Sequence, residues 1–189
     1  VDAFSSIGWN IVIHGQKSYN GVAIASHLPI KNVLKGLPGD HTDDQARYME
    51  ACIADIHVAS IYLPNGNPLP GPKFDYKLSW MKRLNQRAKL LLNSEKPIVL
   101  GGDFNVIPDD LDCYDPIGWE GDALTHPKTR EAFRELVYSG YYDALRNLYP
   151  HEVIYTYWDY QAGAWQRDNG VRIDHLILSP EATDLLENV

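Results

Sequence analysis

The sequence predicts an α/β fold in which mixed β-sheets are layered with helices. Short β-rich runs separated by turn residues fill the first third of the chain. Two later segments carry apolar residues at helical spacing, and one wholly apolar run ends in polar residues. Because 44% of the 189 residues are hydrophobic, we expect one core and a single domain over residues 1–189.

The predicted strands of the first third are bounded by residues that favour turns, such as Gly15, Asn20-Gly21 and Pro29. Four runs are predicted as strands: 9–14, 22–26, 48–54 and 57–63. Further along, Ile98–Leu100 is short and entirely apolar, which is typical of a buried strand. Two more strands are predicted at 155–159 and 171–178, with a loop between them.

Two segments predict helices. Apolar residues from Phe74 to Leu91 recur at spacings of three and four, which places them on one face of a helix. A second helix is expected to begin near Thr125, with Pro127 in its first turn. We interpret the basic residues of the first helix as a solvated face: Lys73, Lys77, Lys82, Arg83, Arg87 and Lys89.

The composition excludes several function classes. A net charge of -8 argues against a protein that holds nucleic acid by bulk charge, although a carboxylate-rich nuclease site remains compatible with it. No apolar run is long enough to cross a membrane. Cys52 and Cys113 are interpreted as reduced thiols of a cytoplasmic protein. The motifs G-x-S-x-G, H-E-x-x-H and C-x-x-C and the Walker loop do not occur.

Polar residues follow the predicted strand at Ile98–Leu100. Asp103 and Asn105 are two residues apart, so in an extended chain both side chains point the same way. A carboxylate accepts a proton from water, and a neighbouring amide donates to a phosphate oxygen, so this pair is suited to phosphoester hydrolysis. The alternative is that both residues merely cap a turn.

Asp174 and Tyr62 are further candidates. Asp174 interrupts an otherwise apolar strand, either as a structural partner of Arg172 or a lysine, or as a group that orients a catalytic histidine. His175 is excluded from that role because successive strand residues face opposite sides. Tyr62 ends a predicted strand, where its phenol either contacts a phosphate or packs as an ordinary strand aromatic.

The segment from Tyr155 to Arg167 is unusually aromatic for a loop. Aromatic and guanidinium groups stack on bases or enter a groove of DNA, although aromatic residues more often belong to a core. Composition therefore favours packing for Tyr157 and Trp158. We interpret Trp165, which lies between Gly163 and Arg167, as part of a contact surface.

Several short motifs together resemble the exonuclease III and apurinic/apyrimidinic (AP) endonuclease family of the endonuclease/exonuclease/phosphatase superfamily. They occur in the order of that family and cover nearly the whole chain: Asn20-Gly21-Val22-Ala23-Ile24, Gln45-Ala46-Arg47, Ile61-Tyr62-Leu63-Pro64-Asn65-Gly66, Gly102-Asp103-Phe104-Asn105, Tyr157-Trp158-Asp159-Tyr160 and Arg172-Ile173-Asp174. Each motif is weak alone, but the ordered set is specific.

The resemblance implies a four-layer, DNase I-like α/β sandwich of two mixed sheets flanked by helices. It also implies hydrolysis of DNA phosphodiesters with Mg²⁺ or Mn²⁺, by 3′→5′ exonuclease action on duplex ends and by incision at abasic sites. The implied partner is double-stranded DNA with abasic sites or 3′ ends. The full-length protein is expected to be a monomer with no membrane partner.

Residue roles carry over by matching position. Asp103 would accept and donate protons, Asn105 would stabilise the transition state, and both would bind the metal. Tyr62 would contact the scissile phosphate, and Asp174 would orient the catalytic histidine. The residues expected to meet DNA are Arg47, Tyr157, Gln161, Trp165, Arg167, Val171 and Ile173, of which Tyr157, Val171 and Ile173 would build a pocket for a flipped-out abasic sugar.

The sequence also departs from the family pattern. The upstream Gln-Glu motif with the main metal-binding glutamate and the downstream Ser-Asp-His segment with the catalytic histidine are not found in it. We therefore expect a polypeptide that is incomplete at both ends and, alone, nearly inactive, since a general acid or base contributes roughly 10²–10⁴-fold. Two alternatives remain open: a phosphoesterase acting on lipids or small phosphoesters, and a non-catalytic DNA-binding module.

Overall fold

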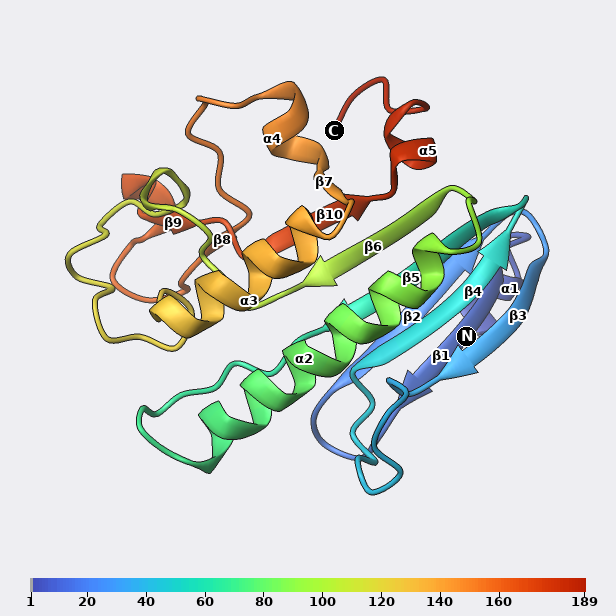
Figure 1. The fold of residues 1–189 in the computed structure, drawn as a ribbon, viewed down its shortest axis with the longest axis horizontal. Helices are drawn as coiled ribbons and strands as arrows, with labels where there is room; N and C mark the ends of the chain where they lie inside the picture. The colour runs from blue at the N-terminus through green and yellow to red at the C-terminus, as the bar shows by residue number, and fades with distance from the viewer. Residues whose placement is uncertain (1) are drawn as a thin grey trace.

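The structure, a computed structural model that describes residues 2–189, is built on a six-stranded mixed sheet (Figure 1). The order of its strands is β3 (Ile30–Lys35), β4 (Tyr48–Ile53), β5 (Ile56–Tyr62), β6 (Ile98–Asp103), β10 (Asp174–Leu178) and β7 (Tyr142–Asp143). Strands β5 and β6 are parallel and are joined through helix α2 (Pro72–Leu92), whereas the other neighbouring pairs are antiparallel.

Two long helices cover one face of this sheet. Helix α2 and helix α3 (Pro127–Tyr138) each have a proline in their first turn, as the sequence predicts for α3, and lie side by side in Figure 1. The main core lies between them and the sheet, with Trp80 and Leu84 of α2 packed in one cluster with Leu100 of β6 and Phe133 of α3. This cluster fixes the position of the strand ends that carry the candidate site.

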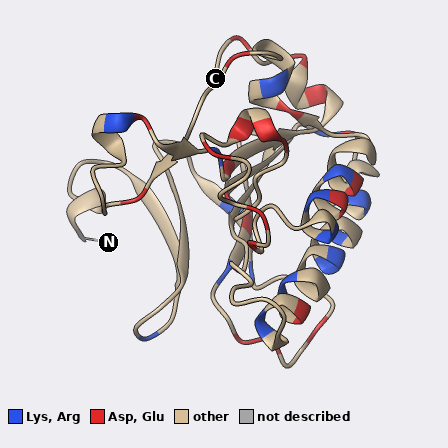
Figure 2. Ribbon diagram, turned by 90° about the vertical axis from the view of Figure 1, so that its left-hand side faces the viewer, with Lys and Arg blue, Asp and Glu red and all other residues tan. Residues whose placement is uncertain are grey.

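A second, two-stranded sheet packs on the opposite face. Strands β1 (Asn10–Gly15) and β2 (Gly21–Ser26) form an antiparallel hairpin, and Val22 and Ile24 pack against Met49 and Ala51 of β4. Figure 2 shows the helices, the central sheet and the hairpin as successive layers. The predicted α/β class is confirmed.

Small elements complete the chain. A third sheet pairs β8 (Tyr157–Trp158) with β9 (Gly170–Val171). The short helices are α1 (Asp2–Ser5), α4 (Ala144–Leu148) and α5 (Pro180–Thr183), with 3-10 turns at Asp110–Asp112 and Trp165–Arg167.

Two predicted strands are wrong in extent, and two strands, β3 and the two-residue β7, were not predicted. The strand expected at 171–178 is interrupted, because Arg172 donates its backbone N–H to Asp112 while Ile173 accepts from Phe104. The strand expected at 155–159 is reduced to β8. Strand β3 escaped prediction because it is an edge strand with few buried residues and a register shift after Lys31.

The expectation of a solvated basic face on α2 is also wrong in part. Lys73, Lys82 and Lys89 are exposed. Lys77 is fully buried, and Arg83 is buried in an ion pair with Asp43. The apolar stem of a long basic side chain packs against apolar surface at little cost. A lysine or arginine on the core-facing side of a helix can therefore be buried, provided that a hydrogen-bond acceptor lies at its charged end.

Within residues 2–189, no helix combines the length and the apolar character needed to cross a bilayer. Cys52 and Cys113 are both free thiols.

Candidate active site

Three predicted site residues lie next to one another on neighbouring strands. Tyr62 of β5 pairs with Asp103 of β6 in the parallel register, and Asp103 pairs with Asp174 of β10 in the antiparallel register. Their neighbours Ile61, Leu100 and Ile177 belong to the core beneath the helices. Side chains alternate along a strand, so all three site residues project from the opposite face of the sheet.

A glycine permits this arrangement. Gly102 has φ of +140°, and a Cβ atom there would lie 2.0 Å from the carbonyl oxygen of Ile61. A side chain at this position is therefore incompatible with the pairing of β5 and β6.

Asp103 and Asn105 form a hydrogen-bonded unit. The backbone N–H of Asn105 donates to Asp103 Oδ1 at 2.8 Å, and Asn105 Nδ2 donates to Asp103 Oδ2 at 3.1 Å. Asn105 Nδ2 also donates to the carbonyl oxygen of Leu63 at 2.9 Å, and Asn105 Oδ1 accepts from Asn65 Nδ2 at 3.1 Å. The two residues thus cap a turn, and the same hydrogen bonds fix the orientation of the Asp103 carboxylate.

This geometry changes the role expected for Asn105. Its side chain is buried, and both amide hydrogens of Nδ2 donate to protein oxygens. Neither is free to reach a phosphate in this arrangement. Asn105 therefore orients Asp103, instead of stabilising a transition state directly as the sequence led us to expect.

The carboxyl groups of the site are both shifted toward the protonated form. Burial raises the pKa of Asp103 to about 6, and the nearby charge of Asp174 adds to this, while hydrogen bonds from Asn105 and the charge of Lys77 oppose it. Asp174 stands at an exposed position, yet partial removal from water also raises the pKa of its carboxyl group. A carboxyl group with a pKa near 6 exchanges protons readily around neutral pH.

The structural partner proposed for Asp174 is not observed. Arg172 pairs instead with Asp112 and Asp143 in the interior, so the alternative of an Arg172–Asp174 pair is wrong. His175 is buried on the helix side of the sheet. The exclusion of His175 as the partner of Asp174 is confirmed, because the two side chains project from opposite faces.

Lys77 is a site residue that sequence reasoning missed. It is fully buried, and its Nζ donates to the backbone oxygens of Asn65 at 2.9 Å and Asn105 at 2.6 Å. Burial lowers the pKa of Lys77 to about 7, against the opposing charges of Asp122 and Asp103. The sequence did indicate that Lys77 is buried, because position 77 falls three residues after Phe74 and four before Met81, within the apolar stripe of α2.

Arg47 lies beside Tyr62. Its guanidinium is 4.8 Å from the ring centroid of Tyr62. Its Nη1 donates to the Tyr62 carbonyl oxygen at 3.3 Å, and its Nε donates to Gln45 at 2.6 Å. These contacts bring Arg47 to the end of β5, next to the row of Tyr62, Asp103 and Asp174.

The aromatic loop is largely at the surface. Trp165 is 67% exposed with one edge against Trp158, and Gln161 and Arg167 are exposed. Tyr157 is 38% exposed, and its phenol pKa is raised by burial and, in part, by the charge of Asp103. This loop therefore offers polar and aromatic groups at the rim of the site.

Val171 and Ile173 do not line an open pocket here, contrary to expectation. Both are buried in a second apolar cluster with Phe74, Ile107 and Leu124. Their side chains pack in the interior instead of facing a ligand.

The site offers oxygen ligands of the kind that Mg²⁺ prefers. No cluster of three or more His, Cys, Asp or Glu side chains arranged to hold a metal occurs within the range 2–189. Mg²⁺ is commonly held by one or two carboxylates, with water and substrate phosphate filling its remaining positions. The Asp103 carboxylate fits such partial ligation, whereas Asn105 directs its amide nitrogen at that carboxylate and its amide oxygen at Asn65.

The comparisons with known proteins agree with this geometry. The family model described as "Endonuclease/Exonuclease/phosphatase family" matches residues 2–186. The chain belongs to this family. The chain is 30% identical to an exodeoxyribonuclease of Bacillus subtilis, covering 95% of the chain and 70% of that protein. It is 32% identical to the DNA repair nuclease APEX1 of Danio rerio, covering 87% of the chain and 53% of that protein.

Solved structures of this family superimpose closely. The 3′-5′ exonuclease NExo of Neisseria meningitidis has a TM-score of 0.96 at 38% identity, covering 98% of the chain and 73% of NExo. NExo has also been solved as a 3′ phosphatase bound to a product DNA hairpin. An AP endonuclease of Archaeoglobus fulgidus has a TM-score of 0.92 at 34% identity, covering 97% of the chain and 71% of that protein.

These relatives place the chain among the DNA-repair phosphodiesterases of the family, with a DNase I-like fold. Enzymes of this class depend on a divalent metal. The predicted family, fold class and enzyme class are thereby confirmed.

Proposed function

We propose that the protein hydrolyses DNA phosphodiesters with Mg²⁺ or Mn²⁺, as a 3′→5′ exonuclease on duplex DNA and as an endonuclease at abasic sites. The observation that carries this proposal is the row of Tyr62, Asp103 and Asp174 across three neighbouring strands. The row combines a phenol donor with two carboxyl groups on one accessible face. One such centre serves both activities, because each breaks the same kind of bond.

Asp103 acts as the proton acceptor and donor in this proposal. A pKa of about 6 lets it take a proton from water and return it near neutral pH, and Asn105 keeps the carboxylate in one orientation. Tyr62 donates a hydrogen bond to the scissile phosphate. Asp174 orients a catalytic histidine other than His175. Asp103 would hold a divalent metal, which would supply positive charge to offset that of the phosphate.

The rim of the site supplies the contacts to DNA. Arg47 lies against Tyr62, and the exposed loop of Gln161, Trp165 and Arg167 presents amide, indole and guanidinium groups to the solvent. Tyr157 stands next to this loop, partly exposed, where it contacts an extruded sugar. Because the reduced thiols Cys52 and Cys113 are suited to a reducing compartment, we place the activity in the cytoplasm.

Incision of a duplex with a single abasic site tests the proposal. With Mg²⁺, the full gene product should cut the abasic strand and should also shorten a plain duplex from its 3′ ends. Asp103→Asn should lower kcat for both by about 10²–10⁴-fold, because the proton acceptor is lost. Asp55→Asn, in the exposed turn between β4 and β5, is the matched control and should keep full activity.

Three outcomes would contradict the proposal. One is release of phosphate from phospholipid head groups or small phosphoesters without any cutting of DNA. Another is tight binding of DNA without turnover in any divalent metal. The third is equal activity of the Asp103→Asn and Asp55→Asn variants.

A further inference from the structure

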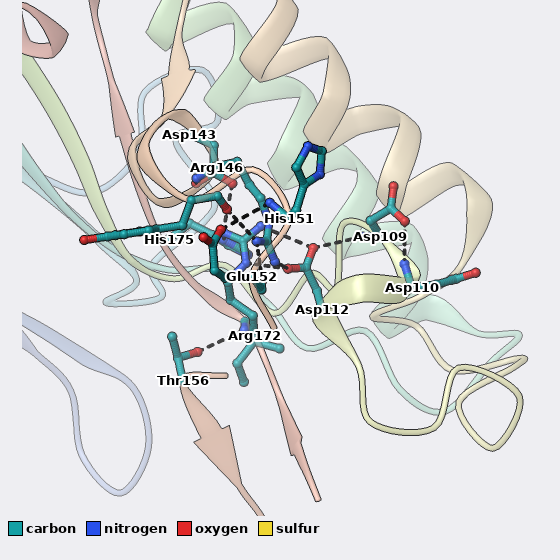
Figure 3. Close-up of polar contacts among 12 residues, drawn as sticks. Asp109, Asp110, Asp112, Asp143, Arg146, His151, Glu152, Thr156, Arg172 and His175 are labelled. Carbon is teal, nitrogen blue, oxygen red and sulfur yellow. Dashed lines mark hydrogen bonds and ion pairs between the residues drawn. The ribbon is translucent and has the colours of Figure 1, made fainter. Parts of the chain in front are cut away.

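A cluster of charged residues surrounds the buried side chain of Arg172 (Figure 3). Arg172 is 1% exposed and lies between β9 and β10. Its Nε donates to Asp112 Oδ1 at 2.7 Å, and its Nη1 donates to Asp143 Oδ2 at 2.8 Å. The same Nη1 lies 2.9 Å from His175 Nδ1. Arg172 thus holds two carboxylates and one imidazole in fixed positions.

The partners of His175 determine its protonation state. A guanidinium group donates hydrogen bonds and accepts none, so His175 Nδ1 must be the acceptor and carries no proton. The other ring nitrogen, Nε2, lies 2.9 Å from the carbonyl oxygen of Val106, which accepts only. The proton therefore resides on Nε2, and the imidazole is neutral.

The surroundings support this assignment. The centroid of the His175 ring is 5.5 Å from that of Phe104 and 4.8 Å from that of Phe133. With its side chain buried between two aromatic rings, the imidazole has no water to stabilise a positive charge.

The Val106 carbonyl belongs to the turn that carries the site. Asn105 adopts φ of +48°, which is uncommon for a residue with a side chain, so the turn needs anchors to hold it. Lys77 of α2 donates a hydrogen bond to the Asn105 carbonyl oxygen, and His175 of β10 donates one to the carbonyl oxygen of Val106. Two buried donors thus hold the consecutive carbonyls of Asn105 and Val106, in the turn that directly follows Asp103.

We infer that His175 is a positioning residue: its neutral Nε2–H holds the Val106 carbonyl and thereby keeps the Asp103–Asn105 unit in its active orientation. This role rests on the proposed function of that unit. It differs from the role of a catalytic histidine, because His175 lies on the face of the sheet away from Asp174 and makes no contact with substrate.

The first test is spectroscopic and needs no DNA. In the protein labelled with ¹⁵N-histidine, the His175 ring should show a pyrrole-like Nε2 bearing hydrogen and a pyridine-like Nδ1 near neutral pH. The amide signals of Phe104 and Asn105 should shift in His175→Leu. A ring protonated on Nδ1, or unchanged amide signals in His175→Leu, would overturn the inference whether or not the protein cuts DNA.

The second test separates positioning from simple loss of stability. His175→Leu removes the donor, His175→Gln offers a replacement N–H, and Ile177→Ala damages the same core two residues along β10. His175→Leu should lower kcat for abasic incision about 10- to 100-fold with KM nearly unchanged. His175→Gln should recover much of this loss, and Ile177→Ala should keep the wild-type kcat while folded.

Equal kcat losses in His175→Leu and Ile177→Ala would refute the positioning role. So would a loss confined to KM. If the wild-type protein cut no DNA while its His175 signals were as described, the proposed function would fail instead, and the two failures are therefore distinguishable.

Discussion

Acid should remove a contribution to the stability of this protein that comes from one buried histidine, His175. Burial lowers the pKa of His175 to about 4, and the charge of Arg172 contributes, while Asp143, Asp112 and the hydrogen bond to Val106 oppose the shift. The ordinary value, which the unfolded chain retains, is 6.5. Between pH 6.5 and about 4, His175 therefore binds a proton in the unfolded chain but not in the folded protein.

The size of the effect follows from these two values. Stability rises with pH wherever the unfolded state binds more protons, so this contribution is complete above pH 6.5 and is lost as the pH falls toward 4. The interval from 6.5 to about 4 corresponds to about 3 kcal/mol, at about 1.4 kcal/mol for each pH unit. A typical domain has about 5–15 kcal/mol in total, so the loss is a large fraction.

Urea unfolding at a series of pH values measures this directly. Between pH 6.5 and 4, the stability of wild type relative to His175→Gln, which has no titratable group there, should fall with a slope approaching one proton. Asp103, whose pKa of about 6 in the folded protein gives a slope of the opposite sign, is common to both proteins and cancels in this difference. Glu50 should not interfere, because its pKa is lowered to about 2 by hydrogen bonds from His57, Arg87 and Tyr48 that outweigh its burial. Parallel curves for the two proteins between pH 6.5 and 4 would refute the reasoning.

Three further outcomes are expected. Lys77→Met leaves the carbonyls of Asn65 and Asn105 without their donor, so the free energy of unfolding should fall by about 1–3 kcal/mol in urea titrations. Lys82→Met, at an exposed position of the same helix, should leave the free energy of unfolding unchanged. Asp112→Asn leaves Arg172 with a weakened partner in the interior and should cost about 3–5 kcal/mol by the same assay; a cost below 1 kcal/mol would contradict the buried pairing. Arg167→Ala should weaken binding to duplex DNA and reduce the slope of log K against log salt by about 0.9, measured by fluorescence anisotropy; an unchanged slope would remove Arg167 from the interface.

Local patterns were sufficient to predict much of the fold. The helical spacing from Phe74 to Leu91 gave α2 within two residues at its start and one at its end, and the alternation and turn residues of the first third gave four strands. These signals depend on neighbours along the chain, so a single sequence contains them. Strand β3 lacked such a signal, because an edge strand is held by its partner instead of by burial of its own residues.

The sequence likewise predicted one part of the candidate site and not the other. The sequence placed Asp103 and Asn105 at the tip of a buried strand and showed that Asp174 and His175 must face opposite sides, since both conclusions follow from the period of a strand. It did not show that Arg172 would turn inward. The acceptors of Arg172 come from Asp112 and Asp143, which are 60 and 29 residues away in the chain.

The sequence by itself therefore determined which residues stand at the ends of strands and which faces they share. Only the tertiary structure decided which charged groups are buried. A buried lysine, arginine or histidine is stable only where distant elements supply its hydrogen-bond partners, and Lys77, Arg172 and His175 acquire theirs from loops and strands that meet after the chain has folded.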